Sequence, residues 1–141
     1  MKRYLSNKNR LIVASLWSIA VVLFLLLVLN IMHQDLTLLP IIILSMVIAL
    51  IVWVLLDTRY VIKKTFLLYR SGPFRGRIDI KKINKVRWFS GLYVPVTMKP
   101  ALGTNGFIIT YNNIEDLYVS PKKAEKFIED LLKVNPTIEV V

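Results

Sequence analysis

The chain has 141 residues, no cysteine and a formal net charge of +10. This length allows one small domain beside a membrane segment. The lack of cysteine excludes disulfide bonds, thiolate catalysis and cysteine-ligated metal sites.

The first element is an apolar run at residues 11–32, which follows a short basic arm. At about 1.5 Å per residue, a helix of this length covers a hydrocarbon core of roughly 30 Å. The run is longer than the apolar region of a signal peptide, about 7–15 residues, and no cleavage motif follows it. The sequence therefore predicts a retained transmembrane helix over 11–32.

A second apolar run at residues 38–56 follows after the short loop HQDLT at 33–37. Pro40 lies in its first turn, where the missing N–H costs little. Neither run contains an ionisable residue, which argues against a channel or a transporter. The two runs together predict a transmembrane hairpin.

The placement of charge predicts the orientation of this hairpin. Basic residues precede the first run and follow the second, whereas the loop at 33–37 has no lysine or arginine. Cytoplasmic flanks carry the excess of lysine and arginine in membrane proteins. We therefore expect two spans with both termini in the cytoplasm and the loop outside.

Residues 57–141 change to short alternating runs separated by turn residues, which is typical of strands. Asn112-Asn113 is a predicted hairpin turn, because asparagine tolerates positive φ. Residues 71–76 and 90–106 contain the glycine and proline typical of loops. The predicted strands are 58–62, 66–70, 77–80, 85–89, 107–111 and 114–120.

A closing helix follows the strands. Ser120 is the predicted cap, Pro121 suits the first turn, and Asn135-Pro136 ends the helix. The predicted solvent-exposed face of this helix includes Asp130. In strand 85–89, alternation places Trp88 inward beside Val86. The apolar stripe of the helix follows helical spacing and comprises Ala124, Phe127, Ile128, Leu131 and Leu132.

This order of strands and one closing helix resembles the pleckstrin-homology (PH)-like layout. The chain resembles the small bacterial membrane-anchored PH-like proteins of the YyaB-like family. The segments that carry this resemblance are TRYVI directly after the hairpin, GRIDIKKINKVR, ALGTNGFIITYNN and LYVSPKKAEKFIEDLLKVNP.

The expected fold class is α+β. A basic arm and transmembrane hairpin at 1–56 precede a cytoplasmic PH-like domain at 57–141, a bent antiparallel β-sheet or barrel closed by a C-terminal helix. The resemblance also implies residence in the bacterial cell membrane. It carries over no catalytic residue. Some bacterial membrane proteins with PH-like domains resemble immunity factors that protect a producer from its own bacteriocin.

Catalytic and cofactor motifs do not occur in the sequence. Ser90 and Ser120 have no histidine partner on the cytoplasmic side. The acidic pairs Glu115-Asp116 and Glu129-Asp130 diverge on a strand or helix, as solvated residues do. A single histidine and no cysteine argue against zinc, and no phosphate-binding loop motif is found. We expect no enzyme activity, no cofactor and no metal.

Basic residues gather in the first third of the domain, which the hairpin would hold nearest the membrane. Each lysine or arginine near an anionic leaflet contributes about 1 kcal/mol. We predict contact with the bilayer and its anionic lipids, although positive-inside topology alone also favours these charges. Nucleic-acid binding is not expected, because aromatics are not interleaved on the same exposed face. The candidate contact residues are Arg59, Lys63, Lys64, Arg75, Arg77, Lys81, Lys82, Lys85 and Arg87.

The sequence thus predicts a membrane-anchored binding or scaffolding module without catalysis, whose partner is a membrane protein or a peptide. The alternative is an immunity-type protector that intercepts a membrane-active peptide. A scaffold would use the strands and the 90–106 loop, whereas a protector would use the 33–37 loop or the helix surfaces. The oligomeric state stays open.

Overall fold

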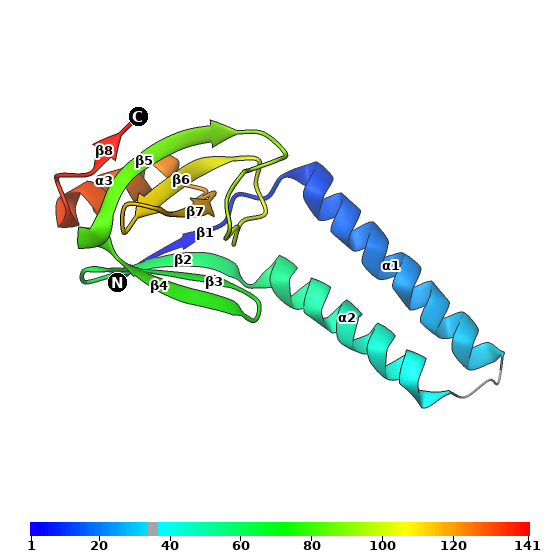
Figure 1. Ribbon diagram of the computed structural model, residues 1–141. Coiled ribbons are helices and arrows are strands. Elements are labelled where there is room, and N and C mark those ends of the chain that lie inside the picture. The colour runs from blue at the N-terminus through cyan, green and yellow to red at the C-terminus, as the bar shows by residue number, and fades with distance from the viewer. Residues whose placement is uncertain (34–36) are drawn as a thin grey trace.

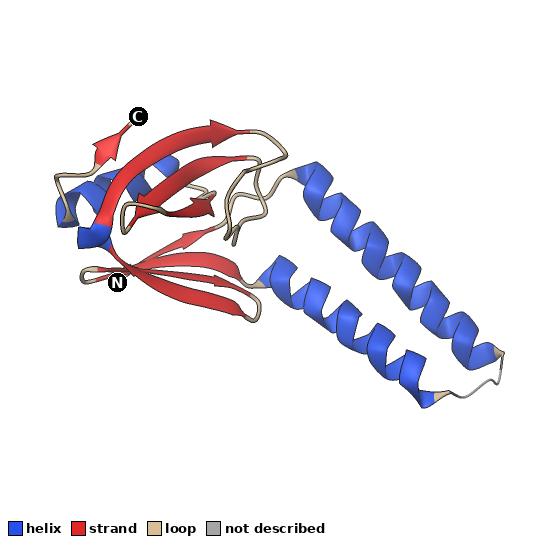
Figure 2. Ribbon diagram, viewed as in Figure 1, coloured by secondary structure: helices blue, strands red, loops and turns tan. Residues whose placement is uncertain are grey.

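The computed structural model describes residues 1–33 and 37–141. A helical hairpin projects from a domain of two sheets and one packed helix (Figures 1 and 2). The hairpin consists of α1 (Arg10–Met32) and α2 (Leu38–Leu56), which lie side by side. Asn9 caps α1, because its side-chain oxygen accepts from the Leu11 N–H at 2.8 Å.

The two helices keep nearly all of their apolar surface exposed. Only Ala20 of α1 and Leu55 of α2 are buried. Both helices are long and apolar enough to cross a membrane. A core helix of a soluble protein would instead be mostly buried. Two helices at the predicted positions, 11–32 and 38–56, are therefore confirmed, whereas their spanning of a membrane and their orientation stay predictions.

The first sheet contains four antiparallel strands in the order β1-β2-β3-β4. The sequence pattern assigned residues 2–5 to a basic arm, but they form β1 and pair with β2, with Tyr4 opposite Tyr60. The hairpin therefore connects the first two strands of the sheet. The strands are β1 (Lys2–Leu5), β2 (Thr58–Lys63), β3 (Phe66–Ser71) and β4 (Phe74–Asp79).

Both ends of the hairpin are fastened to the domain by hydrogen bonds. The Ser6 N–H donates to the Thr58 carbonyl at 3.3 Å, where the two ends meet. The Asn9 N–H donates to the Leu102 carbonyl at 3.0 Å. At α2, the Thr58 hydroxyl donates to the Val54 carbonyl at 2.7 Å. The helices thus join the sheet without a flexible spacer.

The second sheet has the order β7-β6-β5-β8. Asn112 and Asn113 have φ angles of 50° and 69°, which confirms the predicted turn. A short 3₁₀ helix, η1, links the two sheets, and β8 pairs parallel to β5. These elements are η1 (Ile80–Lys82), β5 (Ile83–Ser90), β6 (Asn105–Tyr111), β7 (Glu115–Val119) and β8 (Glu139–Val140).

The main core lies between the two sheets and α3 (Ala124–Val134). Phe127 and Leu131 of the predicted apolar stripe are completely buried. The strands of the described residues form two separate sheets, so the predicted bent sheet takes the form of an open pair rather than a closed barrel. The predicted α+β class, with strands followed by a closing helix, is confirmed.

The long 90–106 segment folds back over the outer face of the second sheet. Val94 packs there against Ile108 and Tyr118. Met98 forms an isolated parallel β-bridge with Leu117, so the segment also covers the edge of β7. The predicted irregular loop therefore packs against that sheet.

Two local predictions about the end of the sheets were wrong. The predicted loop at 71–76 is only a tight turn at Gly72, whose φ is +58°, and β4 begins at Phe74. Trp88 does not point into the core. It is 50% exposed and stacks edge-to-face on Phe107 with ring centroids 5.1 Å apart, because β5 runs past the core at this end.

Three predictions about the closing helix were also wrong. Pro121 does not lie in the first turn of α3, because it forms an isolated β-bridge with Ser6 and precedes the helix by three residues. Ser120 does not cap α3, which begins at Ala124 without a side-chain cap. Ser120 is buried, and its hydroxyl lies 3.1 Å from that of Ser6 and accepts from the Gly103 N–H. Asp130 does not belong to the solvent-exposed face, because its carboxylate is buried against β1.

Candidate membrane-facing site

Arginine side chains gather on the outer face of the first sheet. Alternation sends Tyr60 and Leu67 into the core, so their strand neighbours point outward. Pairing aligns these neighbours in two cross-strand rows. We call this surface the arginine face, with rows Leu5–Arg59–Arg70–Arg75 and Arg3–Val61–Leu68–Arg77.

The arginine face carries more positive charge than its carboxylates offset. Asp57 pairs with Arg70, and its other oxygen lies 3.5 Å from the Arg59 Nε. Within the described part of the chain, Arg75 and Arg77 form no ion pair. Like charges on neighbouring strands repel each other. The face is therefore suited to an anion that would lie over the guanidinium groups.

The arginine face is hollowed at its centre. A depression of about 240 Å³ lies over Val61 and Leu68, with Arg59, Arg70 and Arg75 at its rim. A depression with an apolar floor and a cationic rim fits the region of a bilayer where phosphate groups meet acyl chains. Arginine can lay its aliphatic stem on apolar surface there and keep its guanidinium group near the phosphates.

The row Leu5–Arg59–Arg70–Arg75 lies beside the base of the hairpin. The Thr58 hydroxyl lies 3.0 Å from that of Ser71. This contact joins the start of β2 to the end of β3, next to the end of α2. At the next turn, Gly72 packs directly against Val54 of α2. The arginine face therefore begins three residues after the end of the proposed membrane span.

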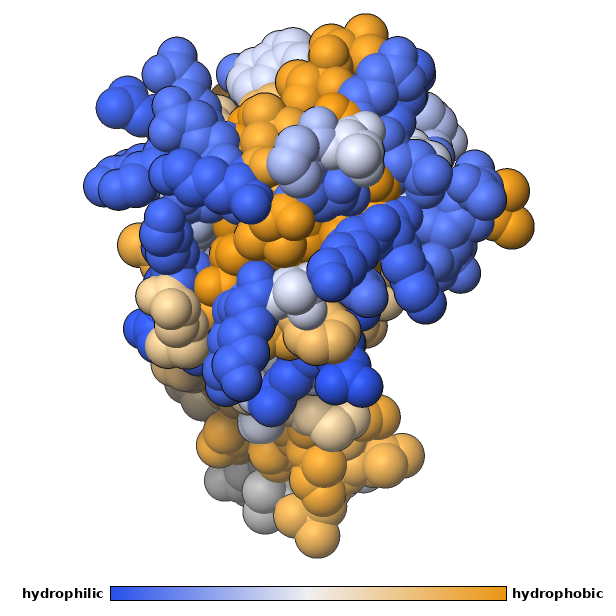
Figure 3. Space-filling view, turned by 90° about the vertical axis from the view of Figure 1, so that its left-hand side faces the viewer, coloured by the Kyte–Doolittle hydropathy of each residue, from blue (hydrophilic) through white to orange (hydrophobic). Residues whose placement is uncertain are grey.

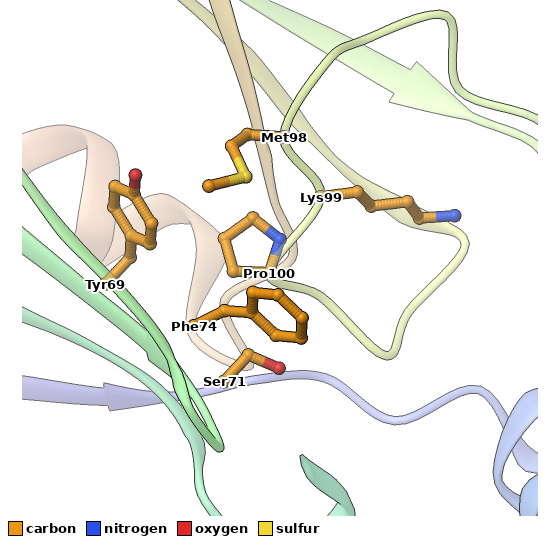
Figure 4. A pocket seen from close by; sticks show the side chains of 6 residues that line it. All are labelled: Tyr69, Ser71, Phe74, Met98, Lys99 and Pro100. Carbon is orange, nitrogen blue, oxygen red and sulfur yellow. The ribbon is translucent and has the colours of Figure 1, made fainter. Parts of the chain in front are cut away.

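A second hollow of about 200 Å³ lies on the inner side of β3 and β4 (Figure 4). The ring of Phe74 lies against Pro100, and Tyr69 and Met98 complete an apolar wall. Lys99 points away from the hollow, and its Nζ lies 5.4 Å from the Tyr118 ring centroid. Burial lowers the pKa of Lys99 and raises the pKa of Tyr69. This hollow is suited to an apolar side chain.

The predicted basic residues do not form one patch, although Arg77 lines a hollow together with Lys63 and Lys64. Arg59 and Arg75 lie at the hairpin end of the first sheet, and Arg77 is one row further. Five residues of strand span about 17 Å, so the opposite strand ends are well separated from the hairpin. Arg87 is exposed on the second sheet. The remaining residues, Lys63, Lys64, Lys81, Lys82 and Lys85, lie at or near the far end.

Figure 3 views this far end, where hydrophilic side chains surround a hydrophobic band. These lysines therefore lie further from the hairpin than Arg59 and Arg75. Their contact with lipid stays a prediction. The sequence reading missed Arg3 and Arg70. Alternation with the inward Leu67 and Tyr69 could have found Arg70, whereas the sequence around Arg3 carries no strand signal.

The described residues contain no group of three or more histidine, aspartate or glutamate side chains that could hold a metal ion. The absence of catalysis and cofactors stays a prediction. The immunity alternative placed a ligand at the 33–37 loop or on the helix surfaces, and residues 34–36 of that loop lie outside the described residues. That alternative also stays a prediction.

A family model described as the bacterial PH domain matches residues 58–135. The chain belongs to the bacterial PH domain family. No curated protein and no solved structure matches it. The matched part of this bacterial PH domain runs from the start of β2 to the end of α3, and the two apolar helices precede it. The strand β1 and the hairpin lie outside the match, although β1 completes the first sheet of the domain.

Proposed function

We propose that this chain is a membrane-anchored binding module, in which the hairpin holds the bacterial PH domain against the cytoplasmic leaflet. The arginine face docks on anionic lipid, and the domain is presented to a partner. The chain performs no chemistry in this proposal. The cross-strand alignment of Arg59, Arg70 and Arg75 beside α2 is the observation that carries it.

The direction of the hairpin supports docking through this face. In Figure 1 the helices leave obliquely, toward the side of the domain on which β2, β3 and β4 lie. A bilayer around the hairpin would therefore approach the outer side of the first sheet. Arginine and lysine attract an anionic surface only within a Debye length, about 10 Å at 0.1 M salt. The side of the domain that faces the bilayer therefore determines which basic side chains attract anionic lipid.

A single label can test the docking, because the chain has no cysteine of its own. The full chain carrying Leu68→Cys, with a polarity-sensitive bimane, is reconstituted in nanodiscs. We expect its emission to shift to the blue when neutral phosphatidylcholine is partly replaced by phosphatidylglycerol. High salt should reverse the shift, since charge attraction is screened.

Arg87→Cys with the same label is the matched control, because Arg87 is exposed on the other sheet. Its emission should not respond to lipid charge. A second variant, Arg59→Glu with Arg75→Glu, should abolish the response at Leu68→Cys. Equal emission of the Leu68 label in neutral and anionic nanodiscs would refute the docking.

A further inference from the structure

The edge of β4 is open. β4 pairs with β3 on one side, and no strand of the described residues pairs with its other side. About half of its backbone N–H and C=O groups therefore point away from the sheet. Such an edge is a template for another extended chain.

The other edges in the domain are protected. The Met98 carbonyl accepts from the Tyr118 N–H at 3.0 Å, which covers β7. At β1, the Leu5 carbonyl accepts from the Lys122 N–H at 2.9 Å. The edge strand β8 has only two residues. Six residues of β4 thus form the long unprotected edge among the described strands.

The two sides of β4 differ in chemistry. Arg75 and Arg77 point outward on the arginine face and are exposed. On the inner side, the apolar hollow lined by Tyr69, Phe74 and Met98 lies next to the strand. Phe74 is 58% exposed, so its side chain is accessible to a partner. Successive side chains of an added strand point to opposite faces and would meet these two environments in turn.

Gly76 keeps the middle of this edge free of side chains. A Cβ at Gly76 would lie 2.2 Å from the Tyr69 hydroxyl oxygen, so only glycine lets the strand pass over that ring. Between Arg75 and Arg77 the strand therefore has no side chain of its own, and the Tyr69 ring covers its inner face.

We propose that the open edge of β4 binds an extended segment of a partner protein in which acidic residues alternate with apolar residues. The backbone of the segment pairs with β4, and an apolar side chain enters the hollow beside Phe74. Its acidic side chains meet Arg75 and Arg77, where they compete with anionic lipid. Main-chain hydrogen bonds supply affinity, and the alternating side chains supply specificity. This inference rests on the proposed binding role and names its partner chemistry.

The test uses the full chain in neutral maltoside micelles, where no anionic lipid competes. The probe is a fluorescein-labelled peptide of nine residues that alternates glutamate and valine, read by anisotropy. Two further peptides carry backbone N-methyl groups, one on all glutamates and the other on all valines. We expect one of these two sets to lose binding and the other to keep it, because only one backbone edge faces β4.

Charge reversal tests the arginines. Arg75→Glu with Arg77→Glu should weaken binding about tenfold or more, since like charges on paired strands repel. Arg87→Glu on the other sheet makes the same kind of change and should leave binding unchanged. Amide exchange at residues 75–77 should slow when the unmodified peptide is bound.

Three results would overturn the inference: no binding of the unmodified peptide, equal binding of both N-methylated sets, or insensitivity to the double charge reversal. Failure here with a lipid response of the Leu68 label would remove only the edge inference. Peptide binding without that lipid response would remove only the docking. The two proposals are therefore separately decidable.

Discussion

The Lys2 Nζ lies 2.6 Å from the Asp130 Oδ1, although 128 residues separate them in sequence. The same carboxylate accepts from the Tyr4 hydroxyl, and Lys133 lies 3.4 Å away. Asp130 is only 3% exposed. This contact ties β1, which precedes the hairpin, to α3 at the other end of the chain.

Removing the charge of Asp130 should destabilise the domain. In Asp130→Asn the ion pair with Lys2 is lost, and the Tyr4 hydroxyl is left with a weaker acceptor. We expect a loss of about 1–3 kcal/mol in the free energy of unfolding, as for other buried hydrogen-bonded groups. Chemical denaturation in micelles measures it. Glu129→Gln changes the exposed neighbour and should have little effect; equal effects of the two variants would contradict this role.

The same contact predicts a stability that falls in acid. Lys2 and Tyr4 lower the pKa of Asp130 from 3.8 to about 2. The folded state therefore holds its proton less tightly than the unfolded state. The resulting stabilisation is fully present above pH 3.8 and is lost as the pH falls toward 2. Thermal unfolding across this range should show a smaller decrease for Asp130→Asn than for the unchanged protein.

The buried hydroxyl of Tyr60 should matter for the closure of the domain. It donates to the Pro100 carbonyl at 2.6 Å and accepts from the Ser120 N–H at 3.2 Å, and burial raises its pKa. Tyr60→Phe leaves both partners unsatisfied, so we expect a loss of about 1–3 kcal/mol. Tyr93 is 82% exposed, and Tyr93→Phe should be neutral in the same unfolding experiment.

The turn that supports α2 should not tolerate a side chain. Gly72 has a φ of +58°, and a Cβ there would lie 2.9 Å from the Val54 Cγ2. Gly72→Ala should cost about 1–2 kcal/mol from the left-handed backbone alone. Gly91→Ala, at a glycine without positive φ, is the control. Similar unfolding midpoints for the two variants would show that the turn does not require glycine at position 72.

The pairing of β1 with β2 predicts that residues before and after the hairpin lie on one side of the membrane. An impermeant maleimide should label His33→Cys in intact cells, because the loop side is expected outside. Val141→Cys should be labelled only after lysis. The reverse pattern would contradict the cytoplasmic placement of the domain.

Strong local patterns were sufficient to predict much of the fold. The two apolar runs, the Asn112-Asn113 turn and the stripe with Phe127 and Leu131 were all readable, because each depends on nearby residues. The strand β1 was not, since four residues with two basic side chains before a span also fit a positive-inside arm. Its partner strand follows more than fifty residues later, beyond the hairpin.

The candidate site was harder to predict for a geometric reason. Residues close in sequence, such as Arg59 and Lys63, lie at opposite ends of the same strand. Arg59 and Arg70 are distant in sequence but directly paired. Only the register reveals the arginine face. The burial of Asp130 was likewise invisible, because its partner Lys2 belongs to the unpredicted strand.

The position of the hairpin between β1 and β2 has a consequence for biogenesis. During synthesis β1 leaves the ribosome first, but its pairing strand emerges only after both apolar helices. The first sheet therefore cannot be completed until the hairpin has been made and its two ends lie side by side. A chain whose two helices did not lie side by side would keep β1 away from β2 and leave Asp130 without Lys2. Completion of the first sheet thus depends on the return of the chain through the hairpin.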